Sequence, residues 1–225
     1  MHLLAAKPGG YTDDEGIVDL AQTPGDIVIL SAADSSLAAL ANVVEHLPAD
    51  YPPVRLANWM QLLKPAAFDL YQDKVLDHAR VVLVSLLGGE NYWRYGVERL
   101  LDWVARGDAQ NPRQLLLVPG DDSPDPALFE AGGGSIENGQ RAWHYLREGG
   151  AANLRQLLYF LADEYLGRDY GWREPQHLPR CLLYMPGQSR QATWDEWAQR
   201  WQQRNPAGER CLLLFYRSHL QSSNT

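Results

Sequence analysis

The sequence predicts an α/β fold with a doubly wound, mostly parallel sheet and helices on both faces. Three observations predict it. Short, wholly apolar segments recur along the chain, most of them end in turns rich in Gly, Pro or Asp, and helical periodicity fills the stretches between them. Strands that are apolar throughout are buried on both faces, as in parallel sheets. Their alternation with helices is typical of folds with right-handed crossovers.

The elements are expected in a regular order. The predicted strands are the apolar runs 3–6, 26–31, 54–58, 81–87 and 114–118. Helices are expected to begin near residue 13 and to cover 34–46, 68–76, 92–104, 136–147 and 151–166, where apolar residues recur at helical spacing. Asp34 is expected to be the N-cap of its helix, since Asp accepts hydrogen bonds from first-turn amides.

Two regions are expected along the chain. Residues 1–170 form the predicted flavodoxin-like or Rossmann-like domain, and residues 171–225 form the start of a second, truncated α/β domain. The boundary is expected in the polar, aromatic and proline-containing stretch 167–179. The second region contains two apolar runs, 180–185 and 210–216, around a helix that Thr193 can cap. A strand–helix–strand unit alone leaves its sheet edges without partners, so either these strands join the first sheet or the chain is the front of a longer protein.

Composition excludes several classes of function. The 225 residues are 45% hydrophobic and 21% charged, which is typical of a globular protein. A net charge of −8 argues against nucleic-acid and membrane-surface binding, because both need clustered Lys and Arg. The chain has no long apolar run, no signal-peptide core and no CxxC around Cys181 or Cys211. A cytoplasmic protein without a metal-ligand motif is therefore predicted.

The central stretch 79–107 contains the first candidate for a ligand site. An apolar strand ends there at Gly88-Gly89, and open α/β sheets bind ligands at the carboxyl ends of their strands. Tyr92 and Trp93 can offer a flat surface to a planar ligand, with Glu90 as a polar partner. The alternative, left open by the sequence, is that both rings only anchor the following helix on the sheet.

The second candidate is Asp121-Asp122, which follows the strand 114–118 and a Pro-Gly turn. Adjacent carboxylates can bind a metal ion or accept hydrogen bonds from a polar ligand. Asp-Asp before Ser-Pro is also typical of an ordinary turn, which is the interpretation that the sequence favours. The chain contains no P-loop, GxSxG or HExxH motif, and its six histidines lack ligand spacing, so no catalytic residue and no metal ligand is predicted.

A resemblance to a known family adds to this interpretation. The chain contains, in this order, the strings MHLLAAKPGG, DIVILSAADSSLAAL, RLANWMQLLKP, FDLYQDKV, VSLLGGENYWRYGVERL, LLLVPGDDSPDP, LLYMPG and LLFYRSHL. Together they resemble the N-terminal part of cobaltochelatase large subunits of the CobN type, which are related to the magnesium chelatase large subunit. The resemblance covers essentially the whole chain, but members of this family are several times longer.

The resemblance implies metal insertion. Family members insert Co(II) into the corrin precursor hydrogenobyrinic acid a,c-diamide on the way to cobalamin, with ATP-driven partner subunits of the AAA+ type. The resemblance places the tetrapyrrole and the metal on the large subunit, with the chelation residues beyond this chain. No cofactor is expected on this fragment, because cobalt and ATP with Mg²⁺ are used by the complete complex. The fragment alone is expected to be inactive.

Two roles are compatible with this resemblance. In the first, the chain forms one wall of the tetrapyrrole site. Its substrate-binding residues are then Gly88, Gly89, Glu90, Tyr92, Trp93, Arg94, Asp121 and Asp122, and truncation of Trp93 weakens binding without unfolding the chain. The acids of the substrate are expected to meet Lys7, Arg55, Lys64 or Arg94. In the second role, the chain is a structural module that docks the rest of its subunit or the ATPase partners. Magnesium insertion into a porphyrin is the nearest alternative reaction.

Overall fold

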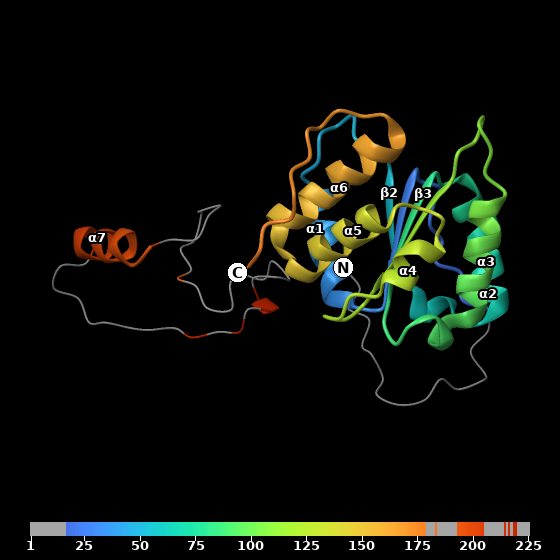
Figure 1. Ribbon diagram of the computed structural model, residues 1–225, viewed down its shortest axis with the longest axis horizontal. Coiled ribbons are helices and arrows are strands. Elements are labelled where there is room, and N and C mark those ends of the chain that lie inside the picture. The colour runs from blue at the N-terminus through green and yellow to red at the C-terminus, as the bar shows by residue number, and fades with distance from the viewer. Residues whose placement is uncertain are drawn as a thin grey trace.

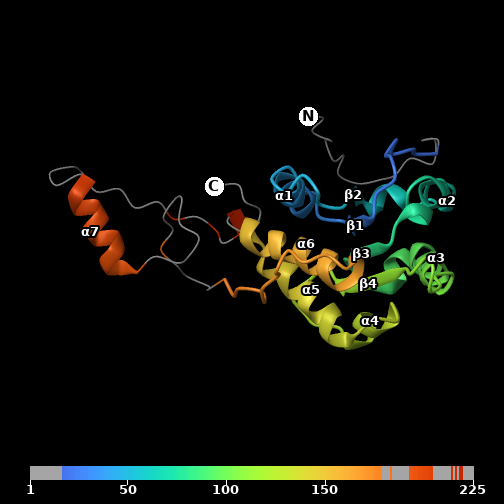
Figure 2. The same ribbon diagram turned by 90° about the horizontal axis from the view of Figure 1, so that it is seen from above.

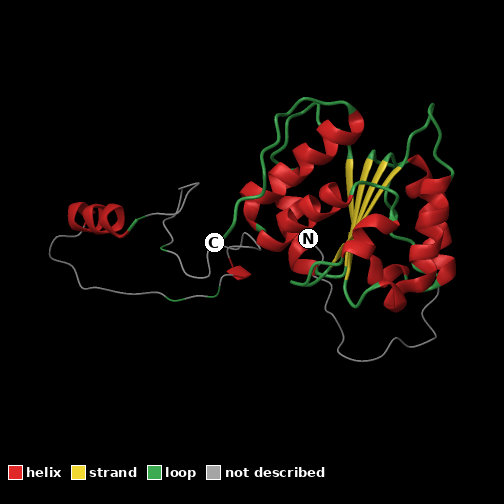
Figure 3. Ribbon diagram, viewed as in Figure 1, coloured by secondary structure: helices red, strands yellow, loops and turns green. Residues whose placement is uncertain are grey.

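The computed structural model describes residues 17–178, 183, 193–204, 214, 216, 218 and 219. At its centre is a parallel sheet in the order β2-β1-β3-β4, drawn as the yellow strands of Figure 3. Its strands are β1 (Ile27–Ser31), β2 (Val54–Asn58), β3 (Val81–Leu86) and β4 (Gln114–Pro119). These four predicted strands are confirmed. The predicted strand 3–6 lies outside the described residues, and so do most of 180–185 and 210–216.

Helices cover both faces of the sheet, which confirms the predicted doubly wound arrangement (Figures 1 and 2). One face carries α1 (Asp34–Val44), α5 (Ile136–Glu148) and α6 (Gly150–Leu166), and the other carries α2 (Pro65–Lys74) and α3 (Arg94–Ala105). The short α4 (Pro126–Ala131) lies beside β4, and α7 (Trp194–Arg204) follows later in the chain. Single 3₁₀ turns cover Trp59–Leu62, Leu76–His78 and Glu90–Trp93.

The alternation of side chains along each strand explains the two layers. In β1, Val28 and Leu30 point into the core beneath α2 and α3, whereas Ile27 and Ile29 point into the core beneath α1, α5 and α6. All four side chains are fully buried. Because neighbouring residues of a strand face opposite sides, a strand covered on both faces must be apolar at every position. This requirement made the strands recognisable in the sequence.

The predicted role of Asp34 as an N-cap is wrong. The N-cap position of α1 belongs to Ala33, whose side chain cannot cap. Asp34 is the first residue of the helix, and its Oδ1 accepts a hydrogen bond of 2.7 Å from Nδ2 of Asn58 at the end of β2. The carboxylate of Asp34 therefore binds a residue of the neighbouring strand, whereas the sequence predicted that it would accept hydrogen bonds from the first-turn amides of the helix. By contrast, Thr193 caps α7, since its Oγ1 accepts from the backbone N–H of Glu196 at 3.3 Å.

The segment 167–178, in which a domain boundary is predicted, packs against α5 and α6. The carboxylate of Asp163 accepts three successive backbone amides of this segment at 2.8, 2.9 and 3.3 Å. Further along, Asn153 exchanges two hydrogen bonds with the backbone of Gln176. The buried carboxylate of Glu148 accepts a hydrogen bond of 2.8 Å from the backbone N–H of Leu178. The predicted boundary near residue 170 stays a prediction, but residues through 178 pack with the first region.

Arg141 of α5 contacts the segment 167–178, and we predict that Arg141→Ala weakens the packing of this segment. The guanidinium lies over the ring of Trp172 at 4.9 Å and bonds Glu174 at 3.0 Å. Because its carboxylate partner is mostly exposed, the ion pair contributes little. The stacking and the lost packing predict a destabilisation of about 1–2 kcal/mol and faster proteolysis of residues 167–178. Arg155 is an exposed arginine on α6. Arg155→Ala is the control and is expected to leave the stability and the proteolysis rate unchanged.

Candidate functional site

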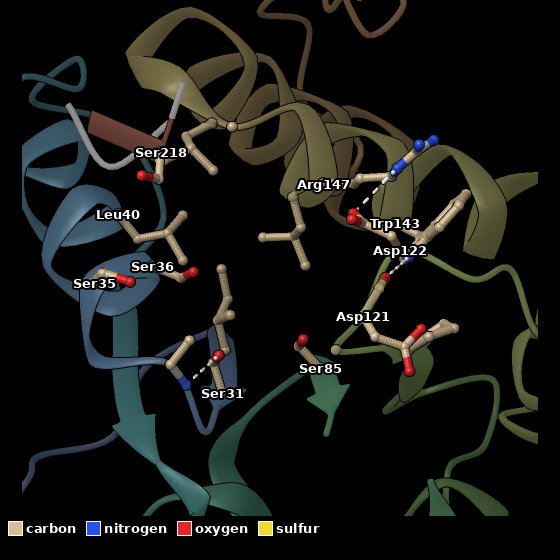
Figure 4. Close-up of a pocket in the computed structure, with 17 residues that line it drawn as sticks. Ser31, Ser35, Ser36, Leu40, Ser85, Asp121, Asp122, Trp143, Arg147 and Ser218 are labelled. Atoms are coloured by element: carbon tan, nitrogen blue, oxygen red, sulfur yellow. Dashed lines mark hydrogen bonds and ion pairs between the residues drawn. The ribbon is translucent and has the colours of Figure 1, made fainter. Parts of the chain in front are cut away.

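A cavity of about 410 Å³ opens at the carboxyl edge of the sheet (Figure 4). From β1 the chain continues to β2 on one side of the sheet, and from β3 it continues to β4 on the other side. The cavity lies between these two diverging connections, at the topological switch point of the sheet. In open α/β folds this crevice is the usual place for a ligand. The sequence predicted this edge of the sheet and, of the residues that surround the cavity, Asp121 and Asp122.

Four serine hydroxyls form one wall of the cavity. Ser31 ends β1 and Ser85 lies near the end of β3, and the parallel register pairs these two residues directly. Ser35 and Ser36 come from the first turn of α1. The Oγ of Ser31 accepts a hydrogen bond of 3.1 Å from the backbone N–H of Ala33, which fixes the loop from β1 to α1. A hydroxyl donates and accepts, so this wall suits a neutral polar group.

The opposite side of the cavity is formed by the turn that contains Asp121 and Asp122, and the carboxylate of Asp121 points away from the cavity (Figure 4). The carboxylate of Asp121 accepts the backbone N–H of Ser123 at 2.9 Å, so the predicted turn is present and also lines the cavity. Asp122, with a 91% exposed side chain, pairs with Arg147 of α5 at 3.4 Å. The indole of Trp143 lies under this guanidinium at 5.1 Å and donates to the carbonyl of Asp121 at 2.9 Å. Trp143 therefore positions both the turn and the cation.

The floor of the cavity is apolar. Ile29 of β1, Leu40 of α1 and Leu154 of α6 contribute side chains that are almost completely buried. A site with an apolar floor and a few polar groups at its rim is the usual composition of a small-molecule pocket. The volume lies near the lower end of the range for such pockets, about 300–1,000 Å³. The cavity fits a side arm of a large ligand and is too small to enclose a macrocycle.

The structure places Trp93 in the core, so the expectation that its ring faces a ligand is not met. Only 2% of the residue is exposed. Its indole stacks on Trp59 with a centroid distance of 5.1 Å, meets Phe68 edge-on at 5.6 Å and donates to the carbonyl of Leu62 at 3.3 Å. Of the two interpretations that the sequence left open, the structure favours the anchor of the helix for this residue.

The remaining predicted residues of this turn do not line the cavity, and all of them except the half-buried Gly89 are exposed. Gly88 and Gly89 adopt positive φ angles of 84° and 74°, which only Gly reaches without strain. Tyr92 is 58% exposed, and Glu90 and Arg94 are exposed as well. The guanidinium of Arg94 pairs with Glu98 one turn further along α3 at 2.8 Å. Their predicted contact with a ligand stays a prediction, separate from the cavity.

The other predicted cations are not at the cavity either. Arg55 donates to the carbonyl and to the hydroxyl of Thr23 at 2.6 and 2.7 Å, which ties β2 to the segment before β1. Lys64 occupies the N-cap position of α2, and Lys7 lies outside the described residues. Among the described residues that line the cavity, Arg147 is the cation, and the sequence interpretation missed it.

His144 lies on α5 directly after Trp143, which lines the cavity, and is expected to make the stability depend on pH. Its partial burial and the nearby positive charge of Arg147 lower the pKa of the imidazole. The unfolded chain then binds a proton near pH 6.5 that the folded chain does not bind, so stability is full above this pH and falls as the pH drops below it. We predict that His144→Gln reduces the loss of stability between pH 7 and pH 5, measured by urea unfolding. An unchanged slope in the variant would contradict this role.

No group of three or more His, Cys, Asp or Glu side chains among the described residues is arranged to hold a metal ion. None of the described helices is both long enough and apolar enough to cross a membrane.

The chain is similar to subunits of metal chelatases. Residues 143–225 match the model of the CobN/Magnesium Chelatase family. Over its whole length the chain is 51% identical to the aerobic cobaltochelatase subunit CobN of Pseudomonas aeruginosa and 32% identical to that of Sinorhizobium sp.. It spans only 17% and 18% of the length of these relatives. The solved catalytic subunit of cobaltochelatase from Mycobacterium tuberculosis matches 73% of this chain, with 25% identity and a TM-score of 0.53, over 12% of its own length.

Proposed function

We propose that this chain, a relative of the N-terminal region of CobN-type cobaltochelatase subunits, forms an α/β domain of a large metal-inserting subunit and contacts its tetrapyrrole substrate. The observation that carries the proposal is the similarity to CobN along all 225 residues, at 51% identity. The match of the family model from residue 143 onward and the likeness to a solved cobaltochelatase subunit support it.

The proposed reaction of the complete protein is the insertion of Co(II) into hydrogenobyrinic acid a,c-diamide during cobalamin biosynthesis. In this proposal, AAA+ type partner subunits hydrolyse ATP with Mg²⁺ and drive the insertion, and the complex works in the cytoplasm. Cobalt is a substrate here and not a resident cofactor of this chain. The chelating groups belong to the rest of the large subunit, so we assign no catalytic residue to this chain.

The proposed contribution of this chain is one wall of the tetrapyrrole site. The cavity at the switch point supports this role, because it combines an apolar floor, hydroxyls and acidic groups at the place where α/β sheets bind ligands. Its volume restricts the contact to the periphery of the macrocycle. The exposed Tyr92 at the neighbouring turn can cover part of the ring beside it.

The reaction is tested with the complete large subunit and its ATPase partners. We expect Co(II) insertion into hydrogenobyrinic acid a,c-diamide, followed by the change in its absorbance, only when ATP and Mg²⁺ are present. The 225-residue chain in place of the complete subunit is expected to give no insertion. Insertion of Mg²⁺ into a porphyrin, with no reaction of cobalt, would favour the magnesium chelatase alternative. Cobalt insertion without ATP would contradict the proposed mechanism.

A second candidate function, the docking of partner subunits, is favoured by helix α7. Trp194, Trp197 and Trp201 stack along one face of this helix with centroid distances of 5.0 and 5.8 Å, and Trp194 is 63% exposed. Interfaces are enriched in Trp. If α7 docks a partner, the ATPase subunits are expected to slow hydrogen exchange of residues 194–204. Unchanged exchange in the assembled complex would remove this candidate.

A further inference from the structure

We propose that the cavity at the ends of β1 and β3 binds the phosphate group of a small phosphorylated molecule. The donors to the phosphate are the hydroxyls of Ser31, Ser36 and Ser85 and the first backbone amides of α1. The inference goes beyond the proposed function, because it assigns a class of ligand from the groups of the cavity alone and depends neither on the tetrapyrrole nor on the rest of the large subunit.

The position of the cavity is the first argument. The strand order β2-β1-β3-β4 places the switch point of the sheet between β1 and β3, where the cavity lies. Doubly wound folds with this order bind their ligands there, and the flavin nucleotide that flavodoxins bind at this point is a phosphate ester. The fold supplies only the position, so the class of ligand has to follow from the residues.

The N-terminal turn of α1 supplies backbone donors. Ala33, Ser35 and Ser36 line the cavity, and no side chain caps this helix. The carbonyl of Ala33 accepts the amides of Ser36 and Leu37, at 3.1 Å each. The preceding two amides, of Asp34 and Ser35, make no hydrogen bond to another described residue. Free amides at the positive end of a helix dipole are suited to bind a phosphate.

The buried hydroxyl of Ser31 is a second and independent argument for an acceptor in the cavity. Only 5% of this residue is exposed. Its Oγ accepts the backbone N–H of Ala33 at 3.1 Å, so its proton is left to donate, and none of the described residues accepts it. A buried donor without an acceptor costs free energy, and a bound oxyanion would remove this cost.

Two further hydroxyls surround the same space. Ser36 comes from α1, and Ser85 is the register partner of Ser31 on β3. Figure 4 shows the hydroxyl oxygens of Ser31, Ser36 and Ser85 turned toward the space between α1 and the end of β3. Within the described chain the side chains of Ser36 and Ser85 make no hydrogen bond, so both hydroxyls are available to a ligand.

No unbalanced carboxylate of the described lining residues opposes an anion here. Asp121 points its carboxylate away from the cavity (Figure 4), and the pair of Asp122 with Arg147 is neutral as a unit. Asp34 bonds Asn58 of β2, on the side of β1 opposite to β3. The hydroxyls alone also suit a neutral group, but backbone amides only donate, and the positive end of α1 favours negative charge.

The arrangement favours a phosphate over a carboxylate. The donors come from the end of β1, from α1 and from β3, so they approach an acceptor from several directions. A phosphate offers three acceptor oxygens and nearly two negative charges, whereas a carboxylate offers two oxygens and one charge. The volume of about 410 Å³ exceeds that of a phosphate group, and Ile29, Leu40 and Leu154 form the floor. The ligand is therefore expected to carry an apolar organic part.

The test is a calorimetric titration of the chain above pH 7 with phenyl phosphate, inorganic phosphate and benzoate. We expect saturable binding of one phenyl phosphate per chain. Inorganic phosphate, which lacks the organic part, and benzoate, which lacks the third oxygen and the second charge, are each expected to bind roughly tenfold more weakly. Ser36→Ala and Ser85→Ala are each expected to weaken the binding of phenyl phosphate three- to tenfold. Ser36→Asp, which adds a carboxylate beside the amides, is expected to prevent saturable binding.

Ser135→Ala is the matched control. This serine is exposed before α5, makes no side-chain capping bond and lies outside the cavity, so binding is expected to be unchanged. Circular dichroism of every variant confirms its fold. Absence of saturable binding by the folded wild type, unchanged binding by the Ser36 and Ser85 variants, or tighter binding of benzoate than of phenyl phosphate overturns the phosphate site. The proposed tetrapyrrole contact is measured with its own ligand and does not depend on these outcomes.

Discussion

Trp93→Ala is expected to destabilise the chain by about 3–5 kcal/mol, the usual cost of removing a fully buried large aromatic side chain. The indole fills the space between the 3₁₀ turn Trp59–Leu62 and α2, with Trp59 stacked on one side and Phe68 edge-on. Its loss leaves a cavity and an unpaired carbonyl at Leu62. Urea unfolding of the variant and the wild type measures the difference.

The neighbouring Tyr92→Ala is the control for this prediction. Its ring meets Trp59 edge-on at a centroid distance of 5.9 Å, and the residue is more than half exposed. We expect a loss of about 1 kcal/mol or less. If Trp93→Ala were as mild as Tyr92→Ala, or if it weakened ligand binding without loss of stability, the indole would be a binding group and not a core residue.

Gly96→Ala is expected to produce the second large effect, a destabilisation of about 1–2 kcal/mol. A Cβ at this position of α3 would lie 2.1 Å from Cε2 and 2.4 Å from Cζ2 of Trp93, well inside van der Waals contact. The indole is held by its neighbours on all sides and cannot move aside without strain. Overpacking of a core typically costs about 1–3 kcal/mol, and the better helix propensity of alanine offsets only about 1 kcal/mol.

The effect of Gly96→Ala on stability is expected to change when Trp93 is also replaced by alanine. In the Trp93→Ala background the clash is absent, so Gly96→Ala is expected to be neutral or to stabilise by up to about 1 kcal/mol through helix propensity. A double-mutant cycle of urea unfolding measures this coupling. Additive effects of the two substitutions would show that the indole does not occupy the space beside Gly96.

The fold was largely predictable because its strands are buried on both faces. Each strand of the described sheet begins and ends within one residue of the predicted run, since continuous apolar segments between Gly, Pro and Asp turns allow few other structures. Helix starts were less predictable. Asp34 was assigned to the helix cap and instead bonds Asn58, and the predicted helix at residue 92 begins with a 3₁₀ turn that leads into α3 at Arg94. Both differences depend on tertiary contacts.

The site was predictable only in part. Asp121-Asp122 could be recognised because the pair follows a strand and a turn directly. The serine wall could not be recognised without the strand order, because Ser31 and Ser85 lie more than fifty residues apart and meet only through the register of β1 with β3. A signal was nevertheless present, since each is the polar residue at or near the end of an otherwise apolar strand. For Trp93, the sequence could not distinguish a residue that anchors the helix from one that binds a ligand. The almost complete burial of the side chain in the structure distinguishes them.

The central claim is that this chain contacts the tetrapyrrole substrate of a cobaltochelatase. The most direct test is the titration of the folded wild-type chain with hydrogenobyrinic acid a,c-diamide, followed by calorimetry because the coloured ligand would screen the fluorescence of the eight tryptophans. Saturable binding with one site per chain is the predicted result. No binding by a chain whose circular dichroism shows an intact fold would contradict the claim and leave this domain a scaffold of the larger subunit.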